Sequence, residues 1–315
     1  MVQIAIAGGS GQIAREVIDV LIATGKHEII VLSRKDPVVE EFIEGTTWVK
    51  VDYADQTAVV KAIQGVHTLL SFIVAHLDVD CIAQKTLIHA AIEAGVKRFA
   101  PSEWGPSDIS TFDWYAGKQV IRDYLKELNK DKKVLEYTLF QPGMLLDFLS
   151  APFKSSKHIR PTELNFDFVN LRAIVVDPAN EVITFTRAHD IGVAVAGAID
   201  YEGEWPIIGG IHGETVTTAK LLSLVEKIKG KPWDVEVVKV EDLEAGELKT
   251  SWLPHFSQPY LTPEEALAFS KGLVIKILLG NIKAAWVVSD EWNQLLPHFK
   301  PTQLEEFLVE HWTGK

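Results

Sequence analysis

The chain has 315 residues, enough for about two domains, and its 47% hydrophobic and 23% charged residues are typical of a globular protein with a sizeable core. This composition excludes a single small module, a collagen-like chain, a coiled coil and a disordered protein. The formal net charge of −12 disfavours a nucleic-acid partner, because an acidic surface repels a phosphate backbone.

The single cysteine, Cys81, cannot form an internal disulfide, which fits a reducing compartment. The first residues lack the basic start and the cleavage pattern of a signal peptide. The longest uncharged run, 62–77, is shorter than the roughly 20 apolar residues of a membrane-spanning helix. We therefore expect a cytoplasmic protein with no membrane span.

The first half of the chain repeats one pattern, a short apolar run followed by a turn and a helix-length segment. Alternating strands and helices predict a parallel sheet covered by helices on both faces. The predicted strands are 2–7, 29–33, 47–51, 67–74, 98–101 and 136–141, and the predicted helices are 12–24, 36–44, 56–64, 79–95 and 113–129.

After Pro142 and Gly143 the pattern loosens. A buried-looking strand at 205–210 follows a helix at 190–199 and resembles the strands of the first half, so we expect the chain to return to the sheet there. A helix at 217–229 then leads into a strand at 235–240, and the last third is helical and rich in aromatic residues.

We predict an α/β fold with a Rossmann-type doubly wound parallel sheet and a smaller, interleaved α+β substrate-binding lobe. The nucleotide-binding domain is expected to span residues 1–150 and to be rejoined by about 189–212. The lobe is expected to comprise 151–188 and 213–315.

The sharpest motif is a glycine-rich turn between the first predicted strand and helix, with the residues Gly8, Gly9, Ser10, Gly11, Gln12 and Ile13. Gly8 lets the chain reverse tightly, and Gly11 leaves the backbone open to a pyrophosphate at the helix N-terminus. Ala14 stands where a third glycine is usual. The turn therefore predicts a dinucleotide site that includes Gly8, Ser10, Gly11, Gln12 and Ile13.

The end of the second predicted strand indicates which dinucleotide is bound. An NAD site usually has an acidic residue there, whereas this chain has Arg34 and Lys35. Two cations favour a ribose 2′-phosphate, so the predicted cofactor is NADP(H).

The reactive end of the cofactor is expected over the carboxyl ends of the later strands. Those ends carry Ser71 and Phe72, then Ser102 within the run 101–105, then Pro142 and Gly143. Ten histidines show no close pairs at metal-ligand spacing, and we expect no metal site.

Lys118 lies in the first turns of the predicted helix 113–129. The positive end of the helix dipole and the like charge of Arg122 one turn later are both expected to lower its pKa. Such a lysine could take or return a proton while a nicotinamide delivers hydride. The alternative is an ordinary surface lysine paired with Asp113, Asp123 or Glu103.

Tyr115 precedes Lys118 by three residues rather than the four of the usual dehydrogenase pair, and Trp114 occupies the expected tyrosine position. Tyr115 is therefore a candidate proton donor, or an aromatic side chain that lines the pocket.

These motifs together resemble the NmrA-like and isoflavone reductase-like family of atypical short-chain dehydrogenases/reductases. The motifs that carry the resemblance are 8–13, 33–35, 101–105, Lys118 with Arg122, 137–143, 189–194 and 230–232. Ala14, Gln12 and Trp104 depart from the family's common residues.

The resemblance implies an NADPH-dependent reductase of an aromatic or conjugated small molecule, of the secondary-metabolism type. It places the family's catalytic lysine on Lys118, its cofactor turn on 8–13, and its 2′-phosphate contacts on Arg34 and Lys35. It also makes a positioning role for Ser102 more credible than a chemical one. Two alternatives stay open, an NmrA-type redox-sensing regulator without turnover and a cyclase or isomerase that uses the same pocket. The sequence does not decide between a monomer and a homodimer.

Overall fold

A six-stranded parallel sheet forms the core of the first half of the computed structural model, which describes residues 1–36, 42–176, 180–254 and 262–315. Its strands follow the order β3-β2-β1-β4-β5-β6, which is the order of a Rossmann fold. The strands are β1 (Gln3–Ala7), β2 (Glu28–Ser33), β3 (Thr46–Lys50), β4 (Thr68–Ser71), β5 (Arg98–Ala100) and β6 (Glu136–Tyr137). The predicted Rossmann-type doubly wound sheet is confirmed.

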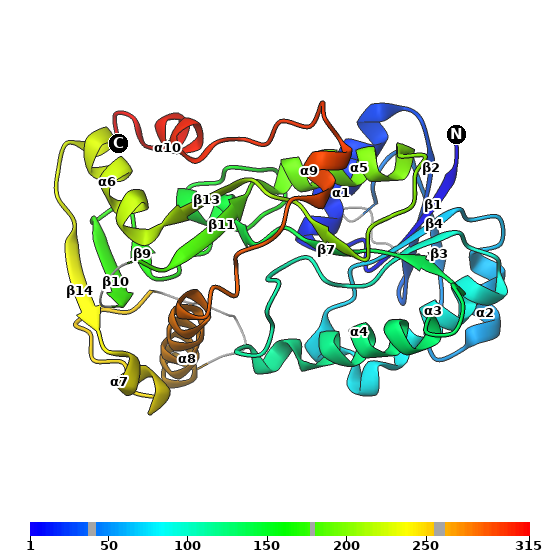
Figure 1. The fold of residues 1–315 in the computed structure, drawn as a ribbon, viewed down its shortest axis with the longest axis horizontal. Helices are drawn as coiled ribbons and strands as arrows, with labels where there is room; N and C mark the ends of the chain where they lie inside the picture. Colours follow the sequence, from blue (N-terminus) through cyan, green and yellow to red (C-terminus); the bar gives the residue numbers. More distant parts are fainter. Residues whose placement is uncertain (37–41, 177–179, 255–261) are drawn as a thin grey trace.

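Helices cover both faces of this sheet (Figure 1). On one face, α1 (Gln12–Thr24) and α5 (Ala188–Asp200) pack together over a core that includes Ile4 and Ile6 of β1. On the other face, a second core includes Ala5 and Ala7. The helices over that core are α2 (Gln56–Ala62), α3 (Ile82–Glu93) and α4 (Ala116–Leu128). Successive residues of β1 thus face opposite cores, which explains why residues 4–7 of the strand are all apolar.

Beyond β6, the chain passes Thr138 and forms β7 (Leu139–Gln141), which pairs in parallel with β12 (Ile208–Gly210). The short helix α9 (Glu291–Leu295) contacts β12, and its Trp292 is fully buried. Segments far apart in the sequence therefore meet beside the six-stranded sheet.

The second lobe lies at the left of Figure 1 and contains two three-stranded sheets, ordered β14-β10-β9 and β13-β11-β8. Its strands are β8 (Met144–Leu145), β9 (Phe166–Asp167), β10 (Arg172–Val176), β11 (Val182–Thr186), β13 (Glu214–Thr217) and β14 (Asp234–Val238). Its helices are α6 (Thr218–Lys229), α7 (Val240–Glu244), α8 (Pro263–Ile282) and α10 (Leu304–Trp312). Since β8 directly follows Gly143, the first strand of these two sheets comes immediately after β7.

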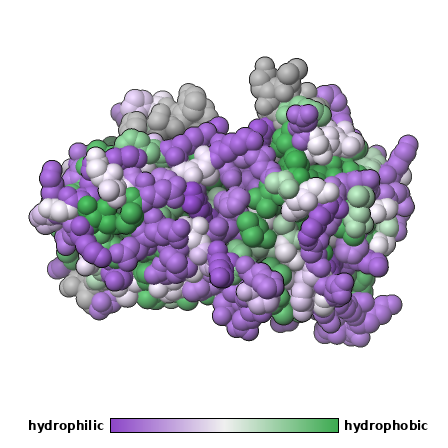
Figure 2. All heavy atoms as spheres, turned by 90° about the horizontal axis from the view of Figure 1, so that it is seen from above, coloured by the Kyte–Doolittle hydropathy of each residue, from purple (hydrophilic) through white to green (hydrophobic). Residues whose placement is uncertain are grey.

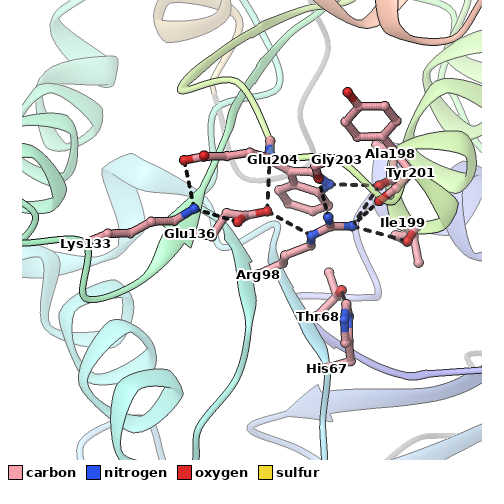
Figure 3. A network of polar contacts seen from close by, with 11 residues as sticks. His67, Thr68, Arg98, Lys133, Glu136, Ala198, Ile199, Tyr201, Gly203 and Glu204 are labelled. Carbon is pink, nitrogen blue, oxygen red and sulfur yellow. Dashed lines mark hydrogen bonds and ion pairs between the residues drawn. The ribbon is translucent and has the colours of Figure 1, made fainter.

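Arg98, at the start of β5, joins the amino-terminal edge of the sheet to the end of α5 (Figure 3). Its guanidinium donates to the carbonyl oxygens of Tyr201 at 2.7 Å and Gly203 at 2.6 Å, and its Nε donates to Glu136 at 3.0 Å. It also lies 5.1 Å from the ring centroid of Trp205. A single buried cation thus binds carbonyls of the segment that follows α5.

Hydrophilic residues cover most of the face seen in Figure 2, with hydrophobic residues gathered in smaller groups between them. None of the helices in the described part of the chain combines the length and the apolar character needed to cross a membrane.

Several predicted elements differ from those observed. The strand predicted at 67–74 stops at Ser71, and the chain continues into a 3-10 turn, Ala75–Leu77. The helix predicted at 79–95 begins only at Ile82, because Asp80 and Cys81 have left-handed backbones that break it. The strand predicted at 205–210 is β12 alone. The helix predicted at 36–44 falls largely on 37–41, outside the described residues.

Candidate functional site

The glycine turn links β1 to α1 at the carboxyl edge of the sheet. Gly8 has a φ of +77°, and a Cβ atom there would lie 2.8 Å from the carbonyl carbon of Phe72. At Gly9 a Cβ atom would lie 2.6 Å from Cγ1 of Val31. These glycines let the turn lie against the end of β4 and against β2.

Gly11 is the N-cap of α1 and offers no side chain to the first N–H groups of the helix. Ser10, Gly11 and Gln12 are exposed, so these helix-terminal N–H groups can serve an anion such as a pyrophosphate. Ile13 is half-buried on the first turn of the helix.

The side chain of Gln12 has a partner that the sequence did not reveal. Its Oε1 accepts a 2.6 Å hydrogen bond from the backbone N–H of Arg160, and Glu16 accepts one from the N–H of His158. The segment 156–160 therefore lies along α1. These contacts join parts of the chain that are far apart in the sequence, so no local sequence pattern indicates them.

Arg34 and Lys35 are both exposed immediately after β2, at the same edge of the sheet as the glycine turn. The neighbouring Asp36 forms an ion pair with Lys50 at 2.5 Å. An exposed pair of cations beside an exposed helix N-terminus fits the 2′-phosphate and pyrophosphate of NADP(H).

Stacked aromatic rings join the ends of β4, β5 and β7. Trp104 lies between Phe72, at a centroid distance of 4.2 Å, and Phe140, at 5.1 Å. Its Nε1 donates to the backbone carbonyl of Ser71 at 2.7 Å. This stack fixes Ser71 and Phe72 next to Gly8 in the turn.

Pro142 and Gly143 connect the sheet to the second lobe. The Pro142 carbonyl accepts a bond from Thr186 at 2.7 Å, and the Gly143 N–H donates to the carbonyl of Gly105 at 3.2 Å. A Cβ atom at Gly143 would lie 2.5 Å from the carbonyl oxygen of Thr184. The structure thus gives these two residues clear packing roles. Their predicted cofactor contacts stay predictions.

Lys118 is buried in the first turn of α4, with 6% of its surface exposed. Its Nζ donates to the backbone carbonyl of Glu103 and lies 4.0 Å from the ring centroid of Tyr115. The surface-lysine alternative is wrong, since Lys118 is buried. Of its three expected partners, Asp113 pairs with Lys276, Asp123 accepts from Gln119, and the carboxylate of Glu103 pairs with Arg122. The loop 101–105 lies over the amine through the carbonyl of Glu103, so little of the lysine side chain faces solvent.

Burial is the largest cause that lowers the pKa of Lys118, to about 8. The carboxylate of Glu103 raises this pKa and the guanidinium of Arg122 lowers it. The lowered pKa agrees in direction with the sequence-based expectation, but its main cause is burial rather than the helix dipole and Arg122. Burial under a distant loop cannot be inferred from local spacing.

Tyr115 and Gly105 complete the surroundings of the amine. A Cβ atom at Gly105 would lie 3.7 Å from Oη of Tyr115 and 3.8 Å from Nζ of Lys118. Burial raises the pKa of the Tyr115 phenol, which keeps it protonated. Gly105 therefore lies close to both the phenol and the amine, and a methyl group at this position would touch both. No local sequence pattern indicates this position of Gly105.

Ser102 is buried at the end of β5, and its N–H donates to Oε1 of the buried Gln84 at 2.9 Å. Gln84 thereby holds the start of the loop that covers Lys118, another function that local sequence does not indicate. Within the described ranges, no group of three or more His, Cys, Asp or Glu side chains is arranged to hold a metal ion.

Comparisons with known proteins agree with this architecture. The model of the NmrA-like family matches residues 2–308. A bifunctional pinoresinol-lariciresinol reductase of Thuja plicata is 32% identical, with 98% of each chain covered, and the oxidoreductase BOA1 of Botryotinia fuckeliana is 28% identical over 74% of this chain and 78% of its own. The solved structure of AtPrR2 with NADP+ and (+)-pinoresinol has a TM-score of 0.71 at 18% identity, with 98% of both chains covered. As the sequence motifs predicted, this chain belongs to the NmrA-like family.

Proposed function

We propose that this protein is an NADPH-dependent reductase of an aromatic or conjugated small molecule, with Lys118 as the residue that transfers a proton. The observation that carries the proposal is the buried amine of Lys118 against the ring of Tyr115, at the carboxyl edge of the sheet that carries the glycine turn.

The coarser part, an oxidoreductase that uses NADP(H), is supported by the named relatives and by the site. The matched relatives are oxidoreductases and reductases, and the matched structure of AtPrR2 holds NADP+. In this chain, the turn 8–13 would hold the pyrophosphate, and Arg34 with Lys35 would hold the 2′-phosphate. When bound, NADPH supplies the hydride.

Lys118 is suited to proton transfer because a pKa near 8 lies close to physiological pH. An alkene, imine or quinone-methide-like centre that accepts hydride also needs a proton. The ammonium form of Lys118 can donate that proton. The neutral amine then takes up a proton from water. Tyr115 has its ring against Nζ and its hydroxyl close to Gly105. It is a second proton donor in this proposal.

The aromatic substrate class is favoured by the side chains next to the amine. Phe112 contacts the rings of Trp114, Tyr115 and Trp286, with centroid distances of 5.2 to 5.7 Å. Trp114 and Tyr115 are the partly exposed rings of this group, and a flat conjugated substrate can stack on them. We propose that the lobe of 151–188 and 213–315 supplies the remaining pocket surface.

The assignment of the 2′-phosphate predicts a change in cofactor preference. Replacing Arg34 and Lys35 with alanine should raise the KM for NADPH roughly 10- to 100-fold, because charge-assisted bonds to the phosphate are lost. The KM for NADH should change little. Steady-state kinetics with both cofactors checks this, and Lys26→Ala, an exposed lysine paired with Asp200, is the control. Equal losses with NADPH and NADH would contradict the assignment.

The close approach of Gly105 to Tyr115 and Lys118 predicts that a larger side chain at this position lowers activity. The contacts of a Cβ atom there are no shorter than 3.6 Å, so Gly105→Ala should fold normally. Gly105→Val should lower kcat/KM about tenfold or more, because its methyl groups would displace the side chains of Tyr115 and Lys118. Kinetics and NADPH titration of both variants check this. A valine variant with unchanged kcat/KM would place the reaction elsewhere.

A further inference from the structure

We propose that Glu103 and Arg122 form a positioning pair for Lys118. The ion pair fixes the carbonyl group to which Nζ is anchored, and its two opposite charges balance each other at the amine. This inference rests on the proposed role of Lys118 and concerns two residues that do not touch the reacting atoms.

The pair is buried and geometrically defined. The carboxylate of Glu103 is 2% exposed and the side chain of Arg122 is 15% exposed. Nε of Arg122 lies 3.1 Å from each carboxylate oxygen, and Nη2 lies 2.5 Å from Oε2. Such a fork-to-carboxylate arrangement sets direction as well as distance, so it can hold a backbone segment in place.

Arg122 also binds the loop beyond Glu103. Its guanidinium donates to the carbonyl oxygens of Ser107 at 3.0 Å and Pro106 at 3.5 Å. One side chain of α4 therefore contacts three residues of the loop 103–107. The loop that covers Lys118 is fastened to the same helix that carries Lys118.

The loop needs this fastening because its backbone is strained. Trp104 has a φ of +39°, which is unfavourable for a residue with a large side chain. Its N–H donates to the carbonyl of Phe140 at 3.0 Å, while the N–H of Glu103 donates to Pro101 at 2.8 Å. Between these two bonds, the Glu103 carbonyl is directed at Nζ of Lys118.

The charges of the pair act on Lys118 in opposite directions. Arg122 is one helical turn beyond Lys118 and on the same face of α4, whereas Glu103 approaches from the covering loop. The carboxylate favours the ammonium form and the guanidinium disfavours it. The third ionisable group at the amine, Tyr115, is neutral. Because the two charges oppose each other, burial remains the dominant influence on the pKa of Lys118.

The test compares Glu103→Gln, Arg122→Met and the double variant. Loss of the carboxylate should move the midpoint of the pH profile of kcat/KM to lower pH, and loss of the guanidinium should move it to higher pH, each by roughly half a pH unit or more. In the double variant the midpoint should return toward the wild-type value. Lys126→Gln removes an exposed charge one turn further along α4 and should leave the midpoint unchanged.

A readout that does not need turnover separates this inference from the proposed function. The pH midpoint of labelling by acetic anhydride follows the fraction of Lys118 that is free amine, whereas the limiting rate at high pH follows access to the buried side chain. Peptide mass spectrometry of labelling at each pH gives both quantities. Opposite shifts in labelling support the positioning pair even if Lys118 proves dispensable for turnover. Shifts in the same direction, or none, would overturn the inference.

If Arg122→Met fails to fold, Arg122→Lys and the double variant decide the matter. Arg122→Lys keeps the charge but cannot reproduce the fork, so it should lower kcat several-fold with the labelling midpoint unchanged. A lysine variant with wild-type kcat, or a double variant whose midpoint stays far from that of the wild type, would contradict the proposed role.

Discussion

Replacing Lys118 with methionine is expected to lower kcat by about 10²- to 10⁴-fold, the usual contribution of a positioned proton-transfer group. The methionine fills a similar volume but carries no proton. Absorbance at 340 nm follows NADPH oxidation with a panel of phenolic enones and imines, and fluorescence titration follows NADPH binding. We expect the titration to show that the variant still binds the cofactor.

The stability of this variant distinguishes lost chemistry from lost structure. The pKa of Lys118 is lowered in the folded protein, so the unfolded chain binds more protons between about pH 8 and the ordinary lysine range. Unfolding is therefore favoured as pH falls through that range, and the full cost is present below pH 8. Methionine has no such cost, so Lys118→Met should be no less stable than the wild type.

Lys126→Met on the exposed side of α4 is the matched control and should keep wild-type kcat. The wild-type profile should lose activity as pH rises through about 8, because the ammonium form donates the proton. Retention of more than a tenth of kcat by Lys118→Met would remove this residue from the mechanism.

Arg98→Met is expected to lower the free energy of unfolding by about 3 to 5 kcal/mol, as for removal of one partner from a buried charged network. The change leaves the carbonyls of Tyr201 and Gly203 without their donor and removes one partner of Glu136 (Figure 3). Urea denaturation followed by circular dichroism measures the loss.

Lys133→Met is the control for Arg98 because it binds the same carboxylate from the surface. Lys133 is 48% exposed and pairs with Glu136 and Glu204, so its loss should cost about 1 kcal/mol or less. Equal effects of the two substitutions would mean that Arg98 does not hold α5 to the sheet.

The strands of the first half could be predicted because each is a short apolar run between turn residues. β1 and β2 differ from their predicted spans by one residue at their first ends. The break at Thr138 separates β6 from β7 and depends on pairing between distant segments. The short length of β12 has the same cause. The left-handed backbones of Asp80 and Cys81 could not be predicted, because neither residue is a glycine.

The candidate site was predictable to the extent that its chemistry is local. The turn 8–13, the cations Arg34 and Lys35, and the helix position of Lys118 follow from contiguous motifs. Three features arise only when separate segments come together: the covering loop, the approach of Gly105 to Tyr115 and Lys118, and the contact of Gln12 with Arg160. Lys118 is therefore a candidate from the sequence alone, whereas its burial is seen only in the folded structure.

The most direct test of the account is hydride transfer from NADPH deuterated at C4 of the nicotinamide to a phenolic enone or imine. We predict that NADPH absorbance at 340 nm falls in step with formation of a reduced product that carries one deuterium on carbon. NADPH that binds but is not consumed with any substrate of the panel would contradict the account and favour a redox sensor. Product formed at the same rate without NADPH would contradict it in favour of a cyclase or isomerase.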